Sequence, residues 1–274
     1  MKNVTRNTLL TTIERFCDAV PRTGAVTESY GGLTLFVRDG YGWPYYARPA
    51  LGGPDPTVDD VLRVRERQRE LGVPETFEWV DEVTPGLAPL ASDAGLAVVR
   101  HPLMVLDQFA PVPVPAGVEV RLLDPASDQL AEDYAAVQAV AMVGFSSPGT
   151  ALGDSGTAER DNAVKMPSAA ELKSERVSLR AGRVARAILA DESGPLCVGS
   201  YQRAGDVVEV VGVATLPNAR RRGLGAAITS ALIRYALDQG AELVFLSAGD
   251  EDVARVYGRV GFRLTATACI AEPT

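Results

Sequence analysis

A short turn rich in arginine and glycine is the part of the chain best suited to bind an anion. It reads Arg220-Arg221-Arg222-Gly223-Leu224-Gly225. A segment rich in β-branched residues, 207–214, predicts a strand before it, and residues at helical spacing follow it as far as Tyr235. A helix N-terminus presents unpaired N–H groups and a positive dipole end, and glycines let an anion approach them. The turn is therefore predicted to bind phosphate, and a pyrophosphate-bearing ligand fits it best.

Three phosphate-binding motifs can be compared with this turn. A Walker A loop ends in Gly-Lys-Ser/Thr, which is missing here. A dinucleotide-binding loop needs a third glycine where Ile228 stands. The turn fits the pattern Arg/Gln-x-x-Gly-x-Gly/Ala in full, and so it resembles the acyl-CoA loop of the GNAT superfamily of N-acetyltransferases. An ordinary strand-turn-helix with a solvated basic turn is the alternative.

A second motif supports the resemblance. Residues 250–262 keep the family's spacing of Tyr257, Gly261 and Phe262, although Asp250 stands where the family usually has Asn. Pro217 precedes the loop, as is common in the family. The two motifs are separated by one predicted helix and one predicted strand, which is the family's order. The resemblance covers residues 118–272.

The resemblance implies that acetyl-CoA is the co-substrate and that its acetyl group passes directly to an amine, with no covalent enzyme intermediate. It also implies a set of cofactor-binding residues. The pantetheine arm pairs with the strand backbone, and the turn and helix start hold the pyrophosphate: Val213, Ala214, Thr215, Arg220, Arg221, Arg222, Gly223, Leu224, Gly225 and Ala226. Of the three arginines, one or two can equally be solvated charges.

Two catalytic residues follow from the same resemblance. Tyr257 corresponds to the tyrosine that protonates the departing CoA sulfur, and a packing tyrosine on a short helix is the alternative. Glu209 stands where the family often has a base, although strand alternation also allows it to point outward from a half-exposed strand. Asp250 corresponds to the residue that helps to hold the cofactor arm, but an acid there repels phosphate, and it can instead cap a helix.

Composition narrows the function classes. The net charge of −8 argues against general binding of nucleic acid, and no apolar run is long enough to cross a membrane. The three scattered cysteines and the absence of a signal-peptide core predict reduced thiols in the cytoplasm. With one histidine and no Cys/His cluster, no metal site is expected. The oligomeric state stays open between monomer and homodimer.

The chain is predicted to hold two domains. Alternating prolines make residues 112–117 a stiff linker between a domain at 1–111 and a catalytic domain at 118–274. Both halves close with a helix-strand-helix-strand order, so the first is predicted to be a degenerate copy of the second. Its loop at 50–56 has prolines and acids instead of arginines, and it is expected to bind no cofactor.

The predicted elements of the first half are a helix at 9–19, strands at 33–37 and 43–47, a helix at 58–71, a strand at 76–80, a helix at 82–94 and a strand at 96–106. Those of the second half before the motif are a strand at 118–123, a helix at 129–143, a flexible loop at 146–156, a helix at 168–179 and strands at 184–189 and 196–203. The fold class is therefore α/β of the α+β type, with two tandem GNAT-like domains, each a mixed, mostly antiparallel sheet flanked by helices.

We expect an acetyltransferase that acts on a primary amine of a small molecule. Protein lysines or N-termini are alternative acceptors. A non-catalytic acyl-CoA sensor and a dinucleotide-binding module are alternatives of other classes.

Overall fold

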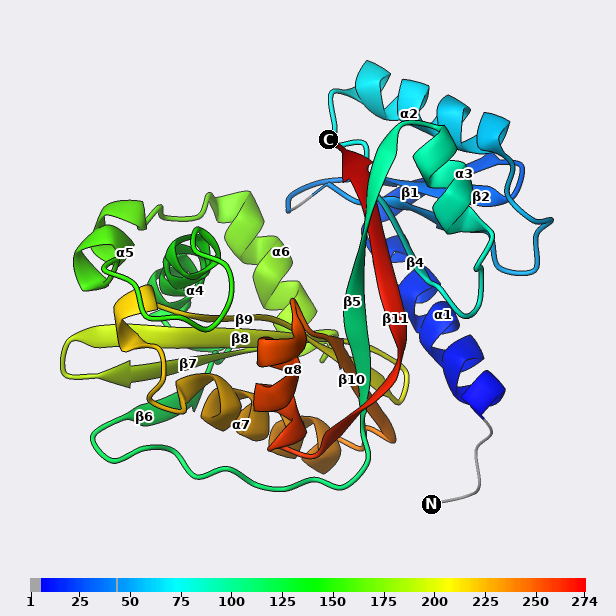
Figure 1. Ribbon diagram of the computed structural model, residues 1–274. Coiled ribbons are helices and arrows are strands. Elements are labelled where there is room, and N and C mark those ends of the chain that lie inside the picture. Colours follow the sequence, from blue (N-terminus) through cyan, green and yellow to red (C-terminus); the bar gives the residue numbers. More distant parts are fainter. Residues whose placement is uncertain (1–5, 43) are drawn as a thin grey trace. The chain divides into compact units, whose positions relative to one another are not determined.

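The computed structural model describes residues 6–42 and 44–274, which form two compact units (Figure 1). Unit 1 comprises Met1–Leu103 and Thr265–Thr274, and unit 2 comprises Met104–Leu264. The chain therefore passes between the units inside two strands, β5 (Leu96–Leu106) and β11 (Phe262–Pro273). The proline-rich segment 112–117 as a linker between domains at 1–111 and 118–274 stays a prediction.

Unit 1 is built from α1 (Arg6–Arg22), β1 (Ala25–Tyr30), β2 (Leu33–Arg38), β3 (Ala47–Pro49), α2 (Val58–Leu71), β4 (Phe77–Val80), α3 (Leu87–Asp93), most of β5 and the end of β11. Unit 2 is built from β6 (Glu119–Leu122), α4 (Leu130–Phe145), α5 (Thr157–Ala163), α6 (Ala169–Arg180), β7 (Val184–Asp191), β8 (Gly194–Ala204), β9 (Val207–Thr215), the 3₁₀ turn η1 (Pro217–Ala219), α7 (Leu224–Asp238), β10 (Leu243–Ser247) and α8 (Glu251–Gly258), with the end of β5 and the start of β11.

The two units repeat one order of elements. In unit 1, β1, β2 and β3 pair antiparallel in sequence, α2 follows, and β4 pairs parallel to β3. In unit 2, β7, β8 and β9 pair antiparallel, α7 follows, and β10 pairs parallel to β9. Each series then continues with a short helix and a long strand. The predicted tandem arrangement of mixed, mostly antiparallel sheets is confirmed.

Most predicted elements are present, with three differences in detail. Strand β1 and helix α5 were not expected, since their sequences are polar and show neither the alternation nor the periodicity of a buried element. Helix α3 begins at Leu87 and not at residue 82, because turns occupy the residues before it and Pro85 has no N–H to donate. Trp43, the start of one expected strand, lies outside the described residues, and that strand, β3, begins at Ala47.

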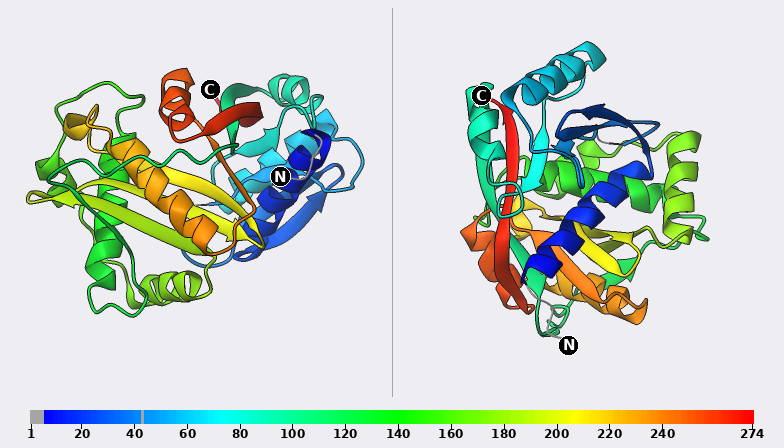
Figure 2. Two further views of the ribbon diagram at one scale, coloured as in Figure 1. Left: turned by 90° about the horizontal axis from the view of Figure 1, so that it is seen from below. Right: turned by 90° about the vertical axis from the view of Figure 1, so that its right-hand side faces the viewer.

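Each unit has its own apolar core. In unit 1, the side chains of α2 and α3 pack on one face of the sheet around Trp79 and Phe77 of β4. In unit 2, α4 and α7 both supply buried residues to a core centred on β7, β8 and β9. Figure 2 shows helices on both sides of these strands. Unit 2 is therefore a three-layer arrangement in which the sheet lies between two groups of helices.

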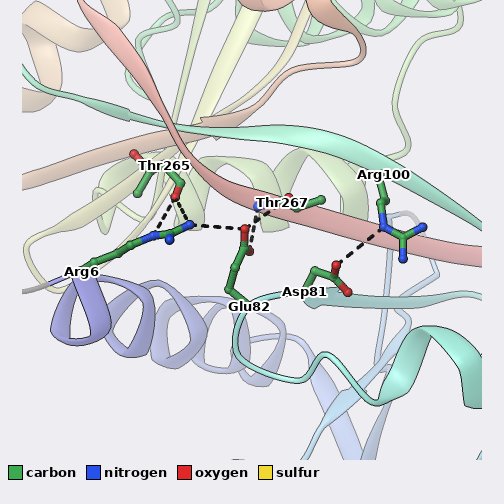
Figure 3. Close-up of polar contacts among 6 residues, drawn as sticks. All are labelled: Arg6, Asp81, Glu82, Arg100, Thr265 and Thr267. Atoms are coloured by element: carbon green, nitrogen blue, oxygen red, sulfur yellow. Dashed lines mark hydrogen bonds and ion pairs between the residues drawn. The ribbon is translucent and has the colours of Figure 1, made fainter.

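The end of β11 completes the sheet of unit 1. Residues Ala268–Ala271 pair antiparallel with Phe77–Val80 of β4. Polar contacts add to this ladder (Figure 3): the Arg6 guanidinium donates to the Thr265 carbonyl at 2.9 Å and pairs with Glu82 at 3.4 Å. Glu82 in turn accepts from the Thr267 N–H at 2.9 Å. Thus α1 and the end of β4 both hold the last strand in place.

A charged cluster is buried under α1 in unit 1. Arg48 of β3 donates to Glu14 of α1 at 3.0 Å, and both side chains are 4% exposed. Glu14 also accepts from the Val80 N–H at 2.9 Å. Glu78 of β4 lies in the same region, and its pKa is raised to about 7, mainly by burial, with Arg48 opposing the shift and Glu272 adding to it.

The raised pKa of Glu78 predicts how the stability of unit 1 depends on pH. Because the folded protein binds the Glu78 proton more tightly than the unfolded chain, the unfolding free energy falls as pH rises from about 4.5 to about 7. The total change attributable to Glu78 is at most about 3 kcal/mol. We expect Glu78→Gln to flatten this slope in urea unfolding measured across that range, whereas Glu242→Gln, at an exposed position of unit 2, should leave it unchanged. Equal slopes in wild type and Glu78→Gln would contradict the assignment.

Candidate active site

A bulge in β9 marks the start of the site. Val211 pairs with Ser200 and Ala214 with Val198, so that Gly212 and Val213 lie opposite the single residue Gly199. Gly212 has φ of +63°, in the left-handed region where glycine carries no steric penalty. A glycine inside a predicted strand is the usual sign of a bulge, and this signal was available in the sequence. The bulge bends β9 just before the predicted pantetheine-binding residues.

Beyond this region β9 presents an open edge. The parallel register with β10 joins Val207, Val208 and Glu209 to Leu243, Val244 and Phe245, and it extends no further. Both strands nevertheless continue, β9 to Thr215 and β10 to Ser247. The backbone of Val213, Ala214 and Thr215 is therefore not paired with β10, and a linear ligand can add to it as a strand does.

The turn after β9 has a specialised backbone. Arg221 has φ of +64°, the one positive value for a residue other than glycine in the described chain, and Gly223 has φ of +79°. The left-handed conformation costs a non-glycine residue about 1–2 kcal/mol. Such strain is common at ligand-binding sites, where the surrounding structure maintains it. Backbone in which left-handed residues lie close to right-handed or turn residues can also direct neighbouring N–H groups toward one side, as in anion-binding nests.

The N–H groups of this turn have no acceptor. Within the described chain, no hydrogen bond is formed by the backbone N–H of any residue from Arg221 through Ala226, and the first to donate is Ala227, to the Gly223 carbonyl at 3.0 Å. Gly223 caps α7 without a side chain that could accept one of these bonds. A buried or half-buried helix start needs acceptors, and a phosphate supplies several at once.

Gly225 leaves open space beside these donors. A Cβ built on Gly225 meets only the Thr215 hydroxyl, at 4.0 Å. The protein's own packing therefore does not require glycine here. A phosphate bound against this backbone does, because a side chain would occupy the space that the ligand needs.

The three arginines have different surroundings. The Arg220 guanidinium donates to the main-chain carbonyls of Gly144 at 2.7 Å, Ser147 at 2.6 Å and Ala151 at 3.1 Å. Arg222 pairs with Asp191 at 3.4 Å. Arg221 is exposed and forms no ion pair within the described residues. Arg220 therefore fixes the loop by its side chain, and Arg221 is the cation left available to a ligand.

The loop at 146–156 is attached to the phosphate-binding turn. Gly153 donates its N–H to the Pro217 carbonyl at 3.2 Å, and Asn218 donates to Ser155 at 3.0 Å. Together with Arg220, these bonds hold a segment that the sequence predicted to be flexible. The sequence could not show this, because the glycine and serine content of the loop does not reveal that Arg220, from a distant part of the chain, donates hydrogen bonds to it.

Tyr257 lies on α8 with its ring packed against Phe262, the two centroids 6.1 Å apart. Burial raises the pKa of the phenol, and the nearby Cys197 adds to the shift. No hydrogen bond involving the Tyr257 hydroxyl is present among the described residues. The phenol therefore stays protonated at neutral and moderately alkaline pH and can donate its proton.

Glu209 and Tyr257 approach the open edge of β9 from opposite faces of the sheet. Glu209 pairs with Gln202, and alternation places both on the face of Ser200, where Arg186 donates to the Ser200 hydroxyl at 3.0 Å. Cys197 lies on the other face with Tyr201, whose ring stacks on Tyr235 of α7, and α8, which carries Tyr257, packs against α7. The sheet thus separates the two candidate catalytic groups.

Asp250 is the N-cap of α8, where its carboxylate accepts from the Val253 N–H at 2.8 Å. This is the helix-capping role that the sequence offered as its alternative. A role in holding the cofactor arm stays a prediction.

Cys197 is the residue beside the site that the sequence did not single out, and only its pairing with Thr215 across two strands reveals it.

The described residues contain neither a cluster of metal-ligating side chains nor a helix that could cross a membrane. No group of three or more His, Cys, Asp or Glu side chains is arranged to hold a metal ion in that part of the chain. None of the helices described combines the length and the apolar character that crossing a bilayer requires.

The part of the chain that contains this site is similar to one known protein family. Residues 182–262 match the family described as the acetyltransferase (GNAT) family, a span that includes β7 through α8. A comparison with curated proteins found no match.

Solved structures are similar over nearly the whole chain. A GCN5-related N-acetyltransferase from Kribbella flavida has a TM-score of 0.69 at 24% identity and covers 97% of this chain and 96% of its own. A GCN5-related N-acetyltransferase-like protein from Streptococcus suis has a TM-score of 0.55 at 13% identity and covers 98% and 99%. A tandem GNAT protein from the clavulanic acid biosynthesis pathway has a TM-score of 0.54 at 15% identity and covers 87% and 77%. These similarities establish the fold.

The space at Gly225 leads to a direct test of the phosphate-binding turn. We expect Gly225→Val to lower the affinity for CoA at least about 10-fold, because the branched side chain fills the space where the pyrophosphate would approach the N–H groups. Isothermal titration calorimetry measures both affinity and stoichiometry, and one CoA per chain is expected for the wild type.

Gly86→Val is a matched control for this substitution. Gly86 also begins a helix, has no heavy atom within 4 Å of a built Cβ, and lies in unit 1. Unchanged CoA affinity in folded Gly225→Val would remove the turn from the binding site.

Proposed function

We propose that unit 2 transfers an acetyl group from acetyl-CoA to a primary amine, because residues 182–262 match the acetyltransferase (GNAT) family. The observation that supports this most directly is the series of unpaired N–H groups from Arg221 through Ala226, beside the open edge of β9. The acceptor proposed is a small molecule.

Acetyl-CoA fits the two parts of this site at once. The pyrophosphate would lie on the N–H groups of the turn and the start of α7, with Arg221 adding positive charge. The pantetheine arm would pair with the backbone of β9 at residues 213–215, where β10 leaves it unpaired. The thioester, at the far end of this arm from the pyrophosphate, would then lie further back along β9, toward the bulge at Gly212 and between the faces that carry Glu209 and Tyr257.

The proposed reaction is a direct attack. The acceptor's ammonium group gives one proton to Glu209, directly or through water, and the resulting neutral amine attacks the thioester carbonyl carbon to form a tetrahedral intermediate with an oxyanion and a positively charged nitrogen. The C–S bond then breaks, the electron pair leaves on sulfur, and Tyr257 supplies the proton that converts the thiolate to a thiol. The nitrogen loses its second proton to solvent as the neutral amide forms, and Tyr257 regains a proton from solvent. An amine entering from the Glu209 face and a thiolate leaving toward the Tyr257 face fits the separation of the two groups.

Unit 1 is proposed to bind no CoA, because the start of α2 already has acceptors of its own. The Thr57 hydroxyl accepts from the Asp60 N–H at 3.2 Å, and the Asp60 carboxylate accepts from the N–H groups of Thr57 at 3.0 Å and Gly32 at 3.3 Å. This carboxylate occupies the start of α2, whereas the corresponding helix start in unit 2, that of α7, has no side-chain cap. An anion could bind at the start of α2 only by displacing the Asp60 carboxylate, which is also negative and already hydrogen-bonded.

Two other functions are distinguished by one experiment. A protein acetyltransferase would acetylate a lysine peptide or a peptide N-terminus in preference to free amines, and an acyl-CoA sensor would bind acetyl-CoA without turnover. Release of free CoA is therefore measured with a panel of small amines and both peptides. Turnover restricted to the peptides, or none with any acceptor despite tight binding, would contradict the proposal.

Tyr257→Phe tests the acid. We expect kcat to fall about 100-fold while the affinity for acetyl-CoA changes little, because the hydroxyl is needed only as the thiolate leaves. Steady-state kinetics and calorimetry on the same sample give the two quantities. A kcat equal to that of the wild type would exclude Tyr257 as proton donor.

Glu209→Gln tests the base. If Glu209 removes the proton, the amide variant should lose most of the increase in kcat/KM that the wild type shows as pH rises, since glutamine cannot accept that proton. Activity is compared from pH 6 to pH 9.5, with Glu242→Gln as an exposed control. An unaltered profile would mean that the amine arrives deprotonated.

A further inference from the structure

The hairpin that joins β7 to β8 lies at the same end of the sheet as the phosphate-binding turn. Cys197 and Thr215 are register partners on β8 and β9, and the Leu216 N–H donates to the Leu196 carbonyl at 2.9 Å. Strand β8 therefore begins where β9 ends. The hairpin residues 191–194 lie at the end of the sheet from which the turn leaves (Figure 1).

This hairpin carries a negative charge in a defined position. The Asp191 carboxylate accepts from the Ser193 hydroxyl at 2.6 Å and from the Ser193 N–H at 2.9 Å. The same two hydrogen bonds, the hydroxyl first, lower the pKa of Asp191, so the carboxylate is ionised at neutral pH. Its side chain is only 19% exposed, and water therefore screens its charge incompletely.

Arg160 of α5 fixes the hairpin itself. Its guanidinium is 8% exposed and donates to the carbonyls of Pro195 at 2.7 Å and Ser193 at 3.0 Å. Gly194, the register partner of Asp191, has φ of +96°, and a Cβ built on it would lie 3.1 Å from that guanidinium. The position of the Asp191 carboxylate is thus set by the protein and does not depend on a ligand.

Arg222 joins this carboxylate to the turn. Its guanidinium lies 3.4 Å from the Asp191 carboxylate, and its side chain is 44% exposed. Because Arg222 belongs to the turn, the carboxylate lies within the reach of one arginine side chain from the turn's backbone. A negative charge at this range repels an arriving phosphate, and the positive charge of Arg222 offsets that repulsion.

The surroundings of the three arginines give each a different part in this arrangement. Arg220 is bonded to main-chain carbonyls, and Arg221 is exposed without an ion pair among the described residues. Arg222 alone of the three pairs with an acid, and that acid lies 31 residues away in the chain. A half-exposed ion pair contributes little to folding stability, so its main effect is expected in the binding of anions.

We propose that Arg222 serves CoA binding as the counter-charge of Asp191, and that Asp191 lowers the affinity of the turn for CoA. This inference rests on the proposed function. Arg222 stays beside Asp191 and forms no hydrogen bond with the ligand. Both residues then act on the phosphates through their charges alone.

The test measures the Kd for CoA by calorimetry at about 0.01 M salt, where the Debye length is about 30 Å. Asp191→Asn keeps an acceptor for Ser193 and removes the charge, so the Kd should fall about 5-fold. Arg222→Gln leaves the carboxylate without its counter-charge, so the Kd should rise about 5-fold. In the double variant the two changes should cancel to within about 2-fold, since they remove opposite charges from neighbouring positions.

Salt gives a second measurement on the same proteins. At about 1 M salt the Debye length falls to about 3 Å, and both single substitutions should then change the Kd by less than about 2-fold. Asp238→Asn is the control. It removes an exposed acid at the other end of α7, about 20 Å from the turn, and should change the Kd less than about 2-fold at either salt concentration. Thermal unfolding shows that each variant is folded.

The outcomes separate this proposal from its rival and from the proposed function. An unchanged or higher Kd in Asp191→Asn would overturn it. A double variant that binds CoA more weakly than the wild type would also overturn it, because Arg222 would then bond to the ligand directly. If the wild type binds no CoA, the proposed function fails as well. CoA binding that is lost in Gly225→Val but is insensitive to Asp191→Asn refutes the charge pair alone.

Discussion

The short parallel pairing of β9 with β10 is the constraint on which the candidate site depends. It ends at Glu209 and Phe245, while β9 continues through a bulge at Gly212 to Thr215. A parallel sheet with full pairing would have no room for a linear ligand, since every N–H and C=O of β9 would already be bonded. Because the pairing stops, the main-chain groups of β9 on its β10 side are left unpaired just before the turn that leads into α7.

The turn after β9 is fixed by Arg220, whose guanidinium is bonded to protein carbonyls and is not available to a ligand. Arg220 is bonded to carbonyls of α4 and of the loop that follows it, so the left-handed backbone at Arg221 and Gly223 is fixed before any anion arrives. Binding to such a preorganised loop avoids the entropy cost of ordering it. Arg220, the first residue of the motif, can therefore contribute to binding by fixing the backbone of the turn, and not by contact between its own charge and the ligand.

The sequence predicted the order of most elements, the tandem repeat and the arginine- and glycine-rich turn between β9 and α7, because glycine positions and hydrophobic periodicity are local signals. It could not show the roles that depend on contacts between distant segments. The hydrogen bonds from Thr215 to Cys197 and from Arg220 to the Gly144 carbonyl join residues far apart in the chain. The sequence left two roles open for Asp250 for the same reason. A helix cap is recognised only from the hydrogen bond that the Asp250 carboxylate accepts from the Val253 N–H.

The attachment of the last ten residues to unit 1 has a consequence for how the chain is made. The strand partner of β4 is residues Ala268–Ala271, although β4 itself ends at Val80. A ribosome releases the first unit long before it synthesises this partner, and at about 5–20 residues per second the edge of β4 waits for many seconds. During that interval the nascent chain displays an unpaired strand edge, a known template for misassociation. Unit 1 is therefore completed only after unit 2 has been synthesised, and a truncation before Ala268 would damage the half of the protein that was translated first.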